Sequence, residues 1–441
     1  MNEKLKRAGD VIIGDVVITS PNGVAIDVGP QILSIEIIEN IFEPFTTGIV
    51  TISDSQNVTN LFPLVGNEFI SISFHTPTTE ADKHYNKKFY IYAVSDKIKT
   101  TDRNSIYQLR IISEEGFRDR TTRVSQTFRG LPHQNIEKIV RSAGLNSSQF
   151  IVVEPAINDL VFISNMWNPS KCIDYISRHA INADNAPTYM FFEQRNRFVF
   201  MTLDALCVQQ PLQQFYVNNW SRQAPTDNIN SSAAIDITRA YQSVKQTKYS
   251  TSFNQFDRID QGYYGSTTTG IDISTQQYVY LRNTRKFDEG KHLNKFSPIP
   301  NHAIIDNTAY INYVPYMTQN FELQNQGITD TDFLYRAQRQ QAFANLMTNH
   351  ITMQVYGRSD YSVGMVVDVF VPKDQQLEKQ EDDPYDHLLS GKYLITSLKH
   401  IVTPLEHVCN MQLMKDSYTV DISHSAVANK SSTTGDSVIV V

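Results

Sequence analysis

Apolar and polar residues alternate along the first quarter of the chain, from about Asp10 to Ser113. A two-residue period places successive side chains on opposite faces of a β-strand, so alternation of this kind indicates half-buried strands. Turn-forming residues such as Pro21-Asn22-Gly23 separate the alternating segments. About six antiparallel strands fit this region. We expect them to form the first domain, residues 9–125.

The pattern changes after Phe128, where apolar residues recur at helical spacing between positions 136 and 143. Gly144 follows them and is suited to end this helix in the left-handed conformation. A second helix is predicted to begin at Asn168-Pro169, with Asn as the N-cap and Pro in the first turn. Two short strands, at 188–192 and 197–203, complete the pattern. Residues 126–210 are therefore predicted to form an inserted α/β domain.

Residues 211–330 are rich in Gln, Asn, Ser, Thr and Tyr and show little periodicity. A helix is predicted at 330–349, and alternation resumes beyond it. Four further strands are expected, at 351–356, 365–371, 393–400 and 408–414. We expect a second β domain made of 211–255 and 345–417, a second inserted region at 256–344, and a flexible C-terminal tail at 418–441.

Two distant stretches share an order of signals that indicates an internal duplication. VGNEFISIS from Val65, KKFYIYAVSD from Lys87 and IYQLRIISEE from Ile106 match VGMVVDVFV from Val363, GKYLITSLKH from Gly391 and VCNMQLMKDS from Val408. The match aligns Tyr393 with Phe89 and Met411 with Leu109. It also predicts that Val367 faces a core with Met365, Val369 and Val371, whereas Asp368 faces the wetter side.

Composition narrows the possible classes of protein. The chain has 441 residues, of which 41% are hydrophobic and 19% charged, as in a folded protein with several cores. The net charge of -7 argues against wrapping nucleic acid by neutralising its phosphates. We expect no signal peptide and no membrane insertion, because no apolar run approaches the roughly 18 residues that a spanning helix needs.

Motifs that carry recognisable chemistry are missing from the sequence. We find no HExxH, Gly-x-Ser-x-Gly or phosphate-binding loop. His400 and His407 bracket a turn and could share a metal ion with a third residue, but local pairing of the two side chains is the more common arrangement. Cys172, Cys207 and Cys409 lie far apart and are expected to be buried free thiols. We therefore expect no catalytic, cofactor-binding or metal-binding residues and no enzymatic activity.

Two groups of charged residues suggest weaker alternatives. The adjacent acids Asp382-Asp383 and Glu114-Glu115 could supply the carboxyl pair of a glycosidase, although neighbouring acids on polar loops are usually only solvated. The chain also has one basic cluster. It could bind phosphate, but it is better suited to ion pairs at a domain or subunit boundary, and its members are Arg118, Arg120, Arg123 and Arg129.

The closing signature of the chain resembles a known family. GKYLI from Gly391, then LKH, then MQLMKDS from Met411 are similar to the last hairpin of baseplate central hub proteins of contractile-tailed, T-even-type bacteriophages. This tail hub family is related to late-control tail proteins and to type VI spike hubs. NPSKCIDYISRHA from Asn168 and the helix at 330–349 resemble its inserted segments. The resemblance implies a β-rich α+β multidomain fold, with two similar antiparallel tube-type β-barrels and inserted α/β domains.

The resemblance also implies a function without chemistry. A hub of this family is a homotrimer that joins the hexameric tail tube to the trimeric central spike. It adapts one symmetry to the other and leaves a channel through which DNA passes without specific binding during genome ejection. The implied partners are the spike protein, the tail tube ring and the tape-measure protein, with no cofactor. The implied location is the virion tail baseplate, assembled in the host cytoplasm. The alternative is a tail-associated cell-wall hydrolase or a carbohydrate-binding virion protein.

Overall fold

The computed structural model describes most of the chain. The described residues are 5–55, 64–77, 79–101, 104–217, 233–251, 255–260, 262, 264–272, 277–284, 288–297, 311–316, 331–347, 349–373 and 384–421.

Seven strands form the first half of a 13-stranded sheet. They are β1 (Ile12–Thr19), β2 (Ala25–Asp27), β3 (Ile32–Asn40), β4 (Thr47–Asp54), β5 (Phe69–His75), β6 (Tyr85–Thr101) and β7 (Asn104–Ser113), with 3-10 turns at Gly29–Gln31 and Ala81–Lys83. Their order in the sheet is β3-β4-β7-β6-β5-β1-β2. We call these strands the first β unit. All of them except β2 contribute fully buried apolar side chains to one hydrophobic cluster, because every second residue points to the same side.

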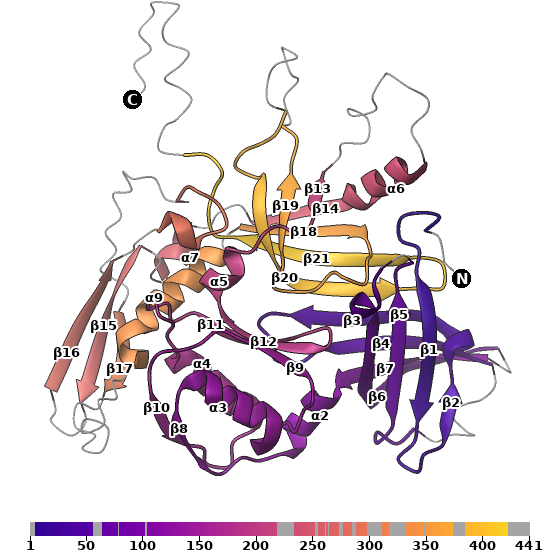
Figure 1. Ribbon diagram of the computed structural model, residues 1–441, viewed down its shortest axis with the longest axis horizontal. Helices are drawn as coiled ribbons and strands as arrows, with labels where there is room; N and C mark the ends of the chain where they lie inside the picture. The colour runs from indigo at the N-terminus through magenta and orange to yellow at the C-terminus, as the bar shows by residue number, and fades with distance from the viewer. Residues whose placement is uncertain are drawn as a thin grey trace, which may run out of the picture.

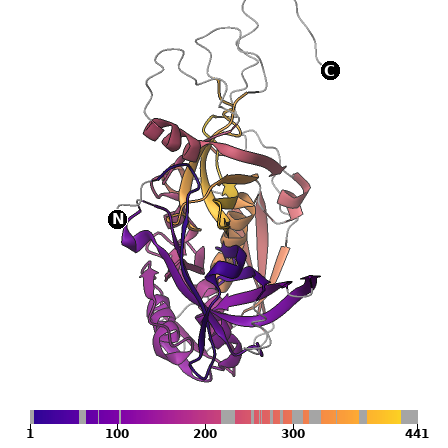
Figure 2. The ribbon, with the colours of Figure 1, turned by 90° about the vertical axis from the view of Figure 1, so that its right-hand side faces the viewer.

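The second β unit is built from strands of the C-terminal third and two strands that precede it. Its elements are β13 (Gln214–Tyr216), helix α6 (Ala233–Gln242), β14 (Val244–Thr251), β18 (Asn349–Tyr356), β19 (Val366–Phe370), β20 (Gly391–Val402) and β21 (His407–Lys415). The strands are ordered β14-β18-β21-β20, and β19 pairs with β20 and with β13. The far half of β20 also pairs with β3, which joins the two units into one sheet (Figure 1). Figure 2 shows the N-terminal elements in the lower half of the view and the C-terminal strands above them.

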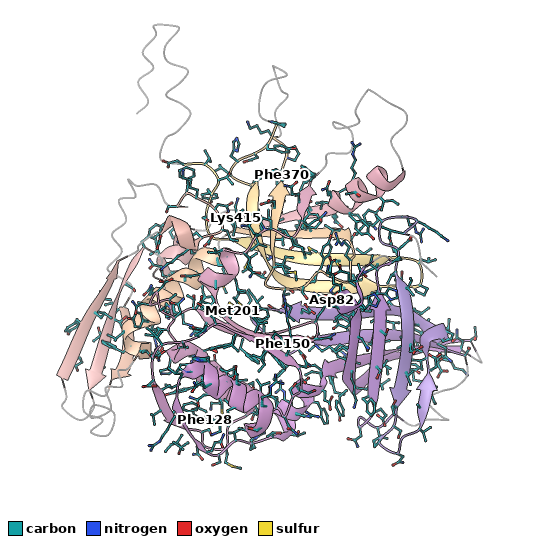
Figure 3. All side chains as sticks on the ribbon, in the orientation of Figure 1. Asp82, Phe128, Phe150, Met201, Phe370 and Lys415 are labelled. Atoms are coloured by element: carbon teal, nitrogen blue, oxygen red, sulfur yellow. The ribbon has the colours of Figure 1, made fainter. Side chains whose placement is uncertain are left out.

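Helices and short strands between the two units form an α/β unit. Its elements are α2 (Glu114–Thr121), β8 (Thr127–Gly130), α3 (Pro132–Lys138), a π-helix (Ile139–Ala143), β9 (Phe150–Val153), β10 (Leu160–Ile163), α4 (Pro169–His179), β11 (Tyr189–Gln194), β12 (Arg197–Thr202) and α5 (Leu203–Cys207). These elements enclose a third hydrophobic cluster, in which Phe128 and Phe162 stack with ring centroids 5.0 Å apart. Figure 3 labels Phe128 and Phe150 in this unit, and Lys415 and Phe370 in the second β unit.

The ends of two helices differ from the sequence-based expectation. Gly144 has a φ of -157°, so it does not end its helix in the left-handed conformation. Its lack of a side chain serves packing instead, because a Cβ there would lie 2.8 Å from the Pro169 ring. Asn168 makes no capping hydrogen bond through its side chain. Asp119 of α2 replaces it, since its carboxylate accepts hydrogen bonds from the Ser170 backbone N–H at 2.7 Å and from the Ser170 hydroxyl at 2.9 Å.

The segment that was least readable in the sequence contains a separate three-stranded sheet. It comprises α7 (Gln255–Asp260), β15 (Gly265–Asp272), β16 (Gln277–Thr284), a 3-10 turn (Glu289–Lys291), β17 (Ile311–Tyr316) and α9 (Thr331–Leu346), which confirms the predicted long helix. Of the expected tail, residues 422–441 lie outside the described residues, whereas Tyr418 pairs with Phe296 in a β-bridge. No helix in the part of the chain that the structure describes is long and apolar enough to cross a membrane.

The two β units share one pairing register as far as Ser95 in β6 and Lys399 in β20, beyond which β6 has two further register shifts that β20 lacks. In the first unit Tyr90 pairs with Ile112 and Ile91 with Ile111, the ladder then skips one residue, and Val94 pairs with Leu109. In the second unit Leu394 pairs with Met414 and Ile395 with Leu413, the ladder skips one residue, and Leu398 pairs with Met411. The shared pairs and the shared bulge agree with the alignment predicted from the sequence. Bulges reshape a strand at a specific position, so the coincidence extends beyond a general likeness of hairpins.

The neighbouring strands extend this correspondence. Ile70 of β5 pairs with Phe89, and Val367 of β19 pairs with Tyr393. On the other side of each hairpin, Val50 of β4 pairs with Leu109, and Met353 of β18 pairs with Met411. The strand orders β3-β4-β7-β6-β5 and β14-β18-β21-β20-β19 are therefore equivalent. The units differ at the next strand, because β1 runs antiparallel to β5 whereas β13 runs parallel to β19.

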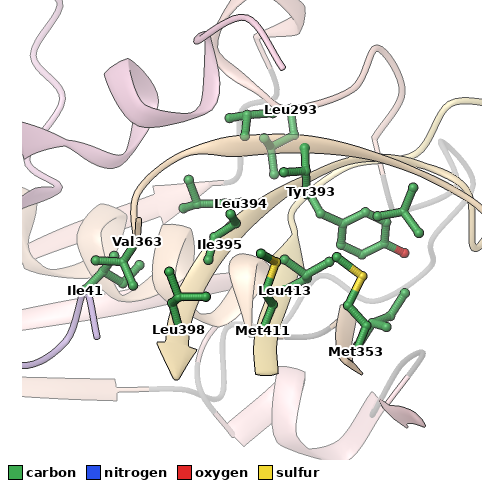
Figure 4. Packing of buried hydrophobic residues seen from close by; sticks show 14 of the residues in the cluster. Ile41, Leu293, Met353, Val363, Tyr393, Leu394, Ile395, Leu398, Met411 and Leu413 are labelled. Carbon is green, nitrogen blue, oxygen red and sulfur yellow. The ribbon is translucent and has the colours of Figure 1, made fainter. Parts of the chain in front are cut away.

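Val367 is fully buried, as predicted, and Asp368 is partly exposed. Val366 is also buried, at 1% exposure, although its parity placed it on the wetter side. The reason is that the second β unit packs on both faces of β19. Its core combines the sheet residues shown in Figure 4 with side chains from α5 and from the β11–β12 hairpin of the α/β unit.

Candidate functional site

Several buried polar and charged side chains lie at or near the junction between the two β units. The far half of β20 pairs with β3 in a register that runs from Ser397 opposite Asn40 to Val402 opposite Ile35. The backbone N–H of Ile41 extends the contact by donating to the carbonyl oxygen of Thr396 at 2.9 Å. The junction is thus a continuous sheet, so neither β unit can move against the other without breaking backbone hydrogen bonds.

A buried ion pair ties the first β unit to the α/β unit. Lys87 Nζ lies 2.7 Å from Glu193 Oε1, with 4% and 0% of the two side chains exposed. The ammonium also donates to Thr46 Oγ1 and to the carbonyl of Arg195 at 2.7 Å, while Glu193 Oε2 accepts from the Thr46 backbone N–H. Two buried charges are tolerated because each has a full set of partners.

Glu39 joins three parts of the chain at the same junction. Its Oε1 accepts from the Arg195 backbone N–H at 2.8 Å, and its Oε2 accepts from the Ser362 hydroxyl at 3.1 Å and the Val363 backbone N–H at 3.3 Å. Burial raises the pKa of the Glu39 carboxyl, and the charge of Lys87 opposes that shift. Sequence reasoning missed Glu39, Lys87 and Glu193. A charged residue at an inward strand position was the only signal that could have identified them.

Among the described residues, the acidic and basic groups singled out in the sequence do not form a common site. Glu114 pairs with Arg118 at 2.6 Å on α2. Glu115 is buried instead of solvated, and it accepts a hydrogen bond from the Ser147 hydroxyl at 2.5 Å. Burial raises the pKa of Glu115, and the nearby charge of Glu193 adds to the shift. Asp382 and Asp383 lie outside the described residues.

The four arginines do not converge on an anion site. Arg118 also donates to the carbonyl oxygens of Leu145 and Asn146, at 3.1 and 2.5 Å, and Arg123 donates to the carbonyls of Arg120 and Thr122. These bonds are local, so Arg118 and Arg123 brace the α/β unit, and both Arg120 and Arg129 are exposed.

Three buried side chains from the end of the β20–β21 hairpin meet at the junction. His400 Nδ1 lies 3.0 Å from His407 Nε2, and Cys409 Sγ lies 3.3 Å from the first nitrogen and 3.5 Å from the second. All three residues have 0% exposure. The sequence indicated the local pairing of the two histidines, but not Cys409, which the sheet register places directly opposite His400.

The surroundings of these three side chains are apolar and aromatic. The ring of Phe74 from β5 lies 5.5 Å from that of His407, and the rings of Phe74 and Tyr85 each lie 6.1 Å from that of His400. Burial lowers the pKa of His400 to about 3 and lowers that of His407 as well. Both imidazoles are therefore neutral at physiological pH, whereas burial raises the pKa of the Cys409 thiol.

Two strand edges, one in each β unit, have fewer neighbours than their counterparts. In the first unit β6 beyond Ile91 pairs only with β7 among the described strands, whereas the equivalent part of β20 pairs with both β21 and β3. β14 forms a ladder with β18 alone within the described ranges, whereas its equivalent β3 lies between β4 and β20. Exposed apolar side chains mark both edges, with Val94 at 41%, Ile98 at 63% and Tyr249 at 40% exposure.

A polar cavity of about 370 Å³ lies between the β5–β6 connection and α6. Two carboxylates, Glu80 and Asp360, and the Arg358 guanidinium line it. Arg358 donates to both oxygens of Asp360, at 3.0 and 2.6 Å, and Lys83 pairs with Glu80 at 3.0 Å. Each carboxylate thus has its own cation, which is unlike the arrangement in which one carboxyl stays protonated as a general acid.

No protein-family model matches the sequence, and no curated protein matches it either. The fold does match solved structures. A tail protein from Neisseria meningitidis superposes with a TM-score of 0.52 at 12% identity, covering 92% of this chain and 98% of that one. The 43 kDa tail protein of prophage MuSo2 from Shewanella oneidensis gives a TM-score of 0.51 at 9% identity, covering 91% and 98%. The chain therefore shares the fold of these two tail proteins over nearly its whole length.

Proposed function

We propose that this chain is the structural baseplate hub of a contractile phage tail, acting as a homotrimer. The observation that carries the proposal is the repeated β unit, in which five strands share their order, the register of the near part of the hairpin and one bulge. Two equivalent units in each of three chains give six similar surfaces. Such a ring matches a sixfold tail tube on one face and a threefold spike on the other.

The open edges supply the contact that closes the ring. Within the chain, β3 pairs with the far half of β20. Applying the same contact between chains places β14 of one protomer against β6 of the next, beside residues 93–98. Each chain then donates one edge of each kind, and three head-to-tail contacts leave no β6 or β14 edge unpaired. In this arrangement each unit curls into a tube-type barrel around its own core.

The remaining features of the proposal follow from this geometry. A ring of six units surrounds a central channel through which DNA passes during genome ejection, and no specific base or phosphate contact is needed for that passage. The partners are the tail tube ring, the trimeric central spike and the tape-measure protein. The chain then resides in the tail baseplate of the virion, after assembly in the host cytoplasm.

The mass of the protein in solution tests the ring. A chain of 50.3 kDa should sediment as a trimer. Ile98→Lys on β6 and Tyr249→Lys on β14 should each abolish the trimer with little loss of thermal stability, because each places a charge at a proposed contact. Ile163→Lys is the matched control, since Ile163 is 69% exposed on β10, away from both edges.

Mixing the two variants sharpens the test. In an equimolar mixture the intact β14 edge of Ile98→Lys can pair with the intact β6 edge of Tyr249→Lys, so one contact forms and a dimer is expected. A trimer that survives in both variants, or a mixture that stays monomeric although the wild type is a trimer, would show that the chains associate through other surfaces.

We propose that the chain has no enzymatic activity. Zymography on peptidoglycan should show no lysis, because the carboxylates of the polar cavity are each paired with a cation. A lysis band that disappears in Asp360→Asn would instead favour the cell-wall hydrolase. A carbohydrate-binding role would require saturable binding of a polysaccharide to the monomer.

A further inference from the structure

We propose that His400, His407 and Cys409 form a zinc-binding site at the junction of the two β units. The proposal rests on the arrangement of these side chains and does not depend on the assembly role. Three potential ligand atoms, His400 Nδ1, His407 Nε2 and Cys409 Sγ, point at one another from the same face of one hairpin. Two imidazole nitrogens and one sulfur form a donor set that Zn²⁺ binds in proteins.

The spacing of the three atoms suits a metal ion. Their separations of 3.0, 3.3 and 3.5 Å are close to the distances between neighbouring ligands in a tetrahedral zinc site. The three atoms lie on a circle of radius about 1.9 Å, slightly less than the roughly 2.0–2.3 Å of Zn–N and Zn–S bonds. A zinc ion therefore fits just outside the plane of the three atoms with little movement of the hairpin.

Without a metal ion, the three ligand atoms cannot all form good hydrogen bonds with one another. If one imidazole donates its N–H to the other, the single lone pair of the accepting nitrogen is used, so the thiol has no free nitrogen acceptor among these atoms. At least one lone pair then faces the others in a site that excludes water, since all three side chains have 0% exposure. A cation at the centre accepts all the lone pairs at once, and the proton of Cys409 is released to solvent when the thiolate binds.

Neighbouring residues complete the site. Gly357 makes room for the His407 ring, because a Cβ at that position would lie 2.3 Å from two atoms of the imidazole. The Tyr361 hydroxyl is buried without a hydrogen-bond partner among the described residues. Phe74 and Tyr85 of the first β unit form the aromatic wall. A bound ion would therefore hold the second hairpin in the shape that packs against the first unit.

The position of the ligands in the sequence provides a route for the metal. His400, His407 and Cys409 lie within ten residues, on a single hairpin. Such a hairpin can bind zinc before the first β unit covers it, so a fully buried site needs no entry channel in the folded protein.

Metal content and cobalt spectroscopy test the site. The full chain, expressed without a polyhistidine tag, should contain about one zinc per chain by elemental analysis. Refolding with Co²⁺ should give the intense visible bands of a tetrahedral site and a near-ultraviolet thiolate-to-cobalt charge-transfer band. Cys409→Ser should lose that band. Cys207→Ser, which changes a buried thiol of α5 in the same hydrophobic cluster, should keep it.

A second measurement covers the case in which Cys409→Ser fails to fold. The double variant Cys172→Ala/Cys207→Ala leaves Cys409 as the sole thiol of the chain, so a charge-transfer band in this variant assigns the thiolate without a change at the site. The zinc proposal is overturned if the wild type holds neither zinc nor cobalt. It is equally overturned if elemental analysis of the isolated protein finds copper in place of zinc. The same holds if the bound metal persists unchanged in both Cys409→Ser and His407→Gln.

Discussion

The two β units have the same order of paired strands, but they differ in which strands pair with their equivalent edges. In the second unit the far half of β20 pairs with β3, and it carries the buried side chain of His400. In the first unit the equivalent part of β6 pairs only with β7 among the described strands, and its Ile98 side chain is 63% exposed. β3 is likewise enclosed between two strands, whereas its equivalent β14 has one neighbour in the described part of the sheet.

This difference shows that backbone strand pairing and side-chain packing have separate requirements. Pairing needs only backbone groups in register, so both units retain the same bulge with unrelated residues, Tyr92 in one and Thr396 in the other. Side-chain packing depends on which unit lies alongside, so buried polar side chains are found where the two β units contact each other. The first unit has its equivalent surface available for another protomer, which is the basis of the proposed ring.

The largest expected effect concerns the equivalent buried positions Ile70 and Val367. Ile70→Asp and Val367→Asp should each lower the free energy of unfolding by more than about 4 kcal/mol, because each buries a carboxylate without a partner. Both side chains have 0% exposure and sit opposite equivalent residues of the two hairpins. Denaturant unfolding measures the loss, and sedimentation should show no trimer for either variant.

Asp368→Asn is the control for the strand, since Asp368 is partly exposed, and it should cost less than about 1 kcal/mol. A Val367→Asp protein that kept its stability and remained a trimer would show that β19 does not line a core. A large loss for only one of the two Asp variants would contradict the equivalence of the units.

The next effect concerns the ion pair that anchors the first unit. Lys87→Met should cost about 3–5 kcal/mol, because Glu193 is left buried without its cation. The double variant Lys87→Met/Glu193→Gln should recover part of that loss in urea unfolding, since it removes the unpaired charge. If the double variant is less stable than the sum of the single changes predicts, the carboxylate depends on other partners.

Strands, hairpins and the duplication could be predicted from the sequence, because they depend on local periodicity and turn residues. The helix at 331–346 and the parity of Val367 are examples. The contact of β20 with β3 could not be predicted, because it joins strands more than 350 residues apart through backbone groups that every residue shares. Cys409 was missed for the same reason, since only the cross-strand register places it beside His400.

A smaller effect concerns pH and a lysine that only the second unit contains. Lys415 occupies the position that is Ser113 in the first unit, and burial lowers its pKa to about 7, with Asp386 opposing the shift. An unfolded lysine keeps its proton up to about pH 10.4. The unfolded state therefore binds more protons between pH 7 and 10, so this group makes the protein more stable as the pH rises through that range.

The comparison with Lys415→Met isolates this contribution. The free energy of unfolding of the wild type, relative to that of the variant, should rise by about 2 kcal/mol between pH 7 and pH 9. Lys415 Nζ also donates to the carbonyl oxygens of Leu388 and Ser390, at 2.5 and 3.2 Å. A flat or falling difference would mean that these hydrogen bonds keep the ammonium charged in the folded protein.

The smallest effect compares the two bulge residues. Thr396 is 1% exposed, its hydroxyl donates to the carbonyl of Gln412 at 3.1 Å, and its own carbonyl accepts from Ile41 of the first unit. Thr396→Val should cost about 1 kcal/mol, because the carbonyl of Gln412 loses a donor. Tyr92 is 50% exposed, so Tyr92→Thr should change the stability of the monomer by less than about 0.5 kcal/mol. Both variants are compared by urea unfolding at a protein concentration low enough to keep the chain monomeric. Equal costs at the two positions would mean that the bulge of the first unit is already covered within one chain, which would remove the reason for placing a second protomer there.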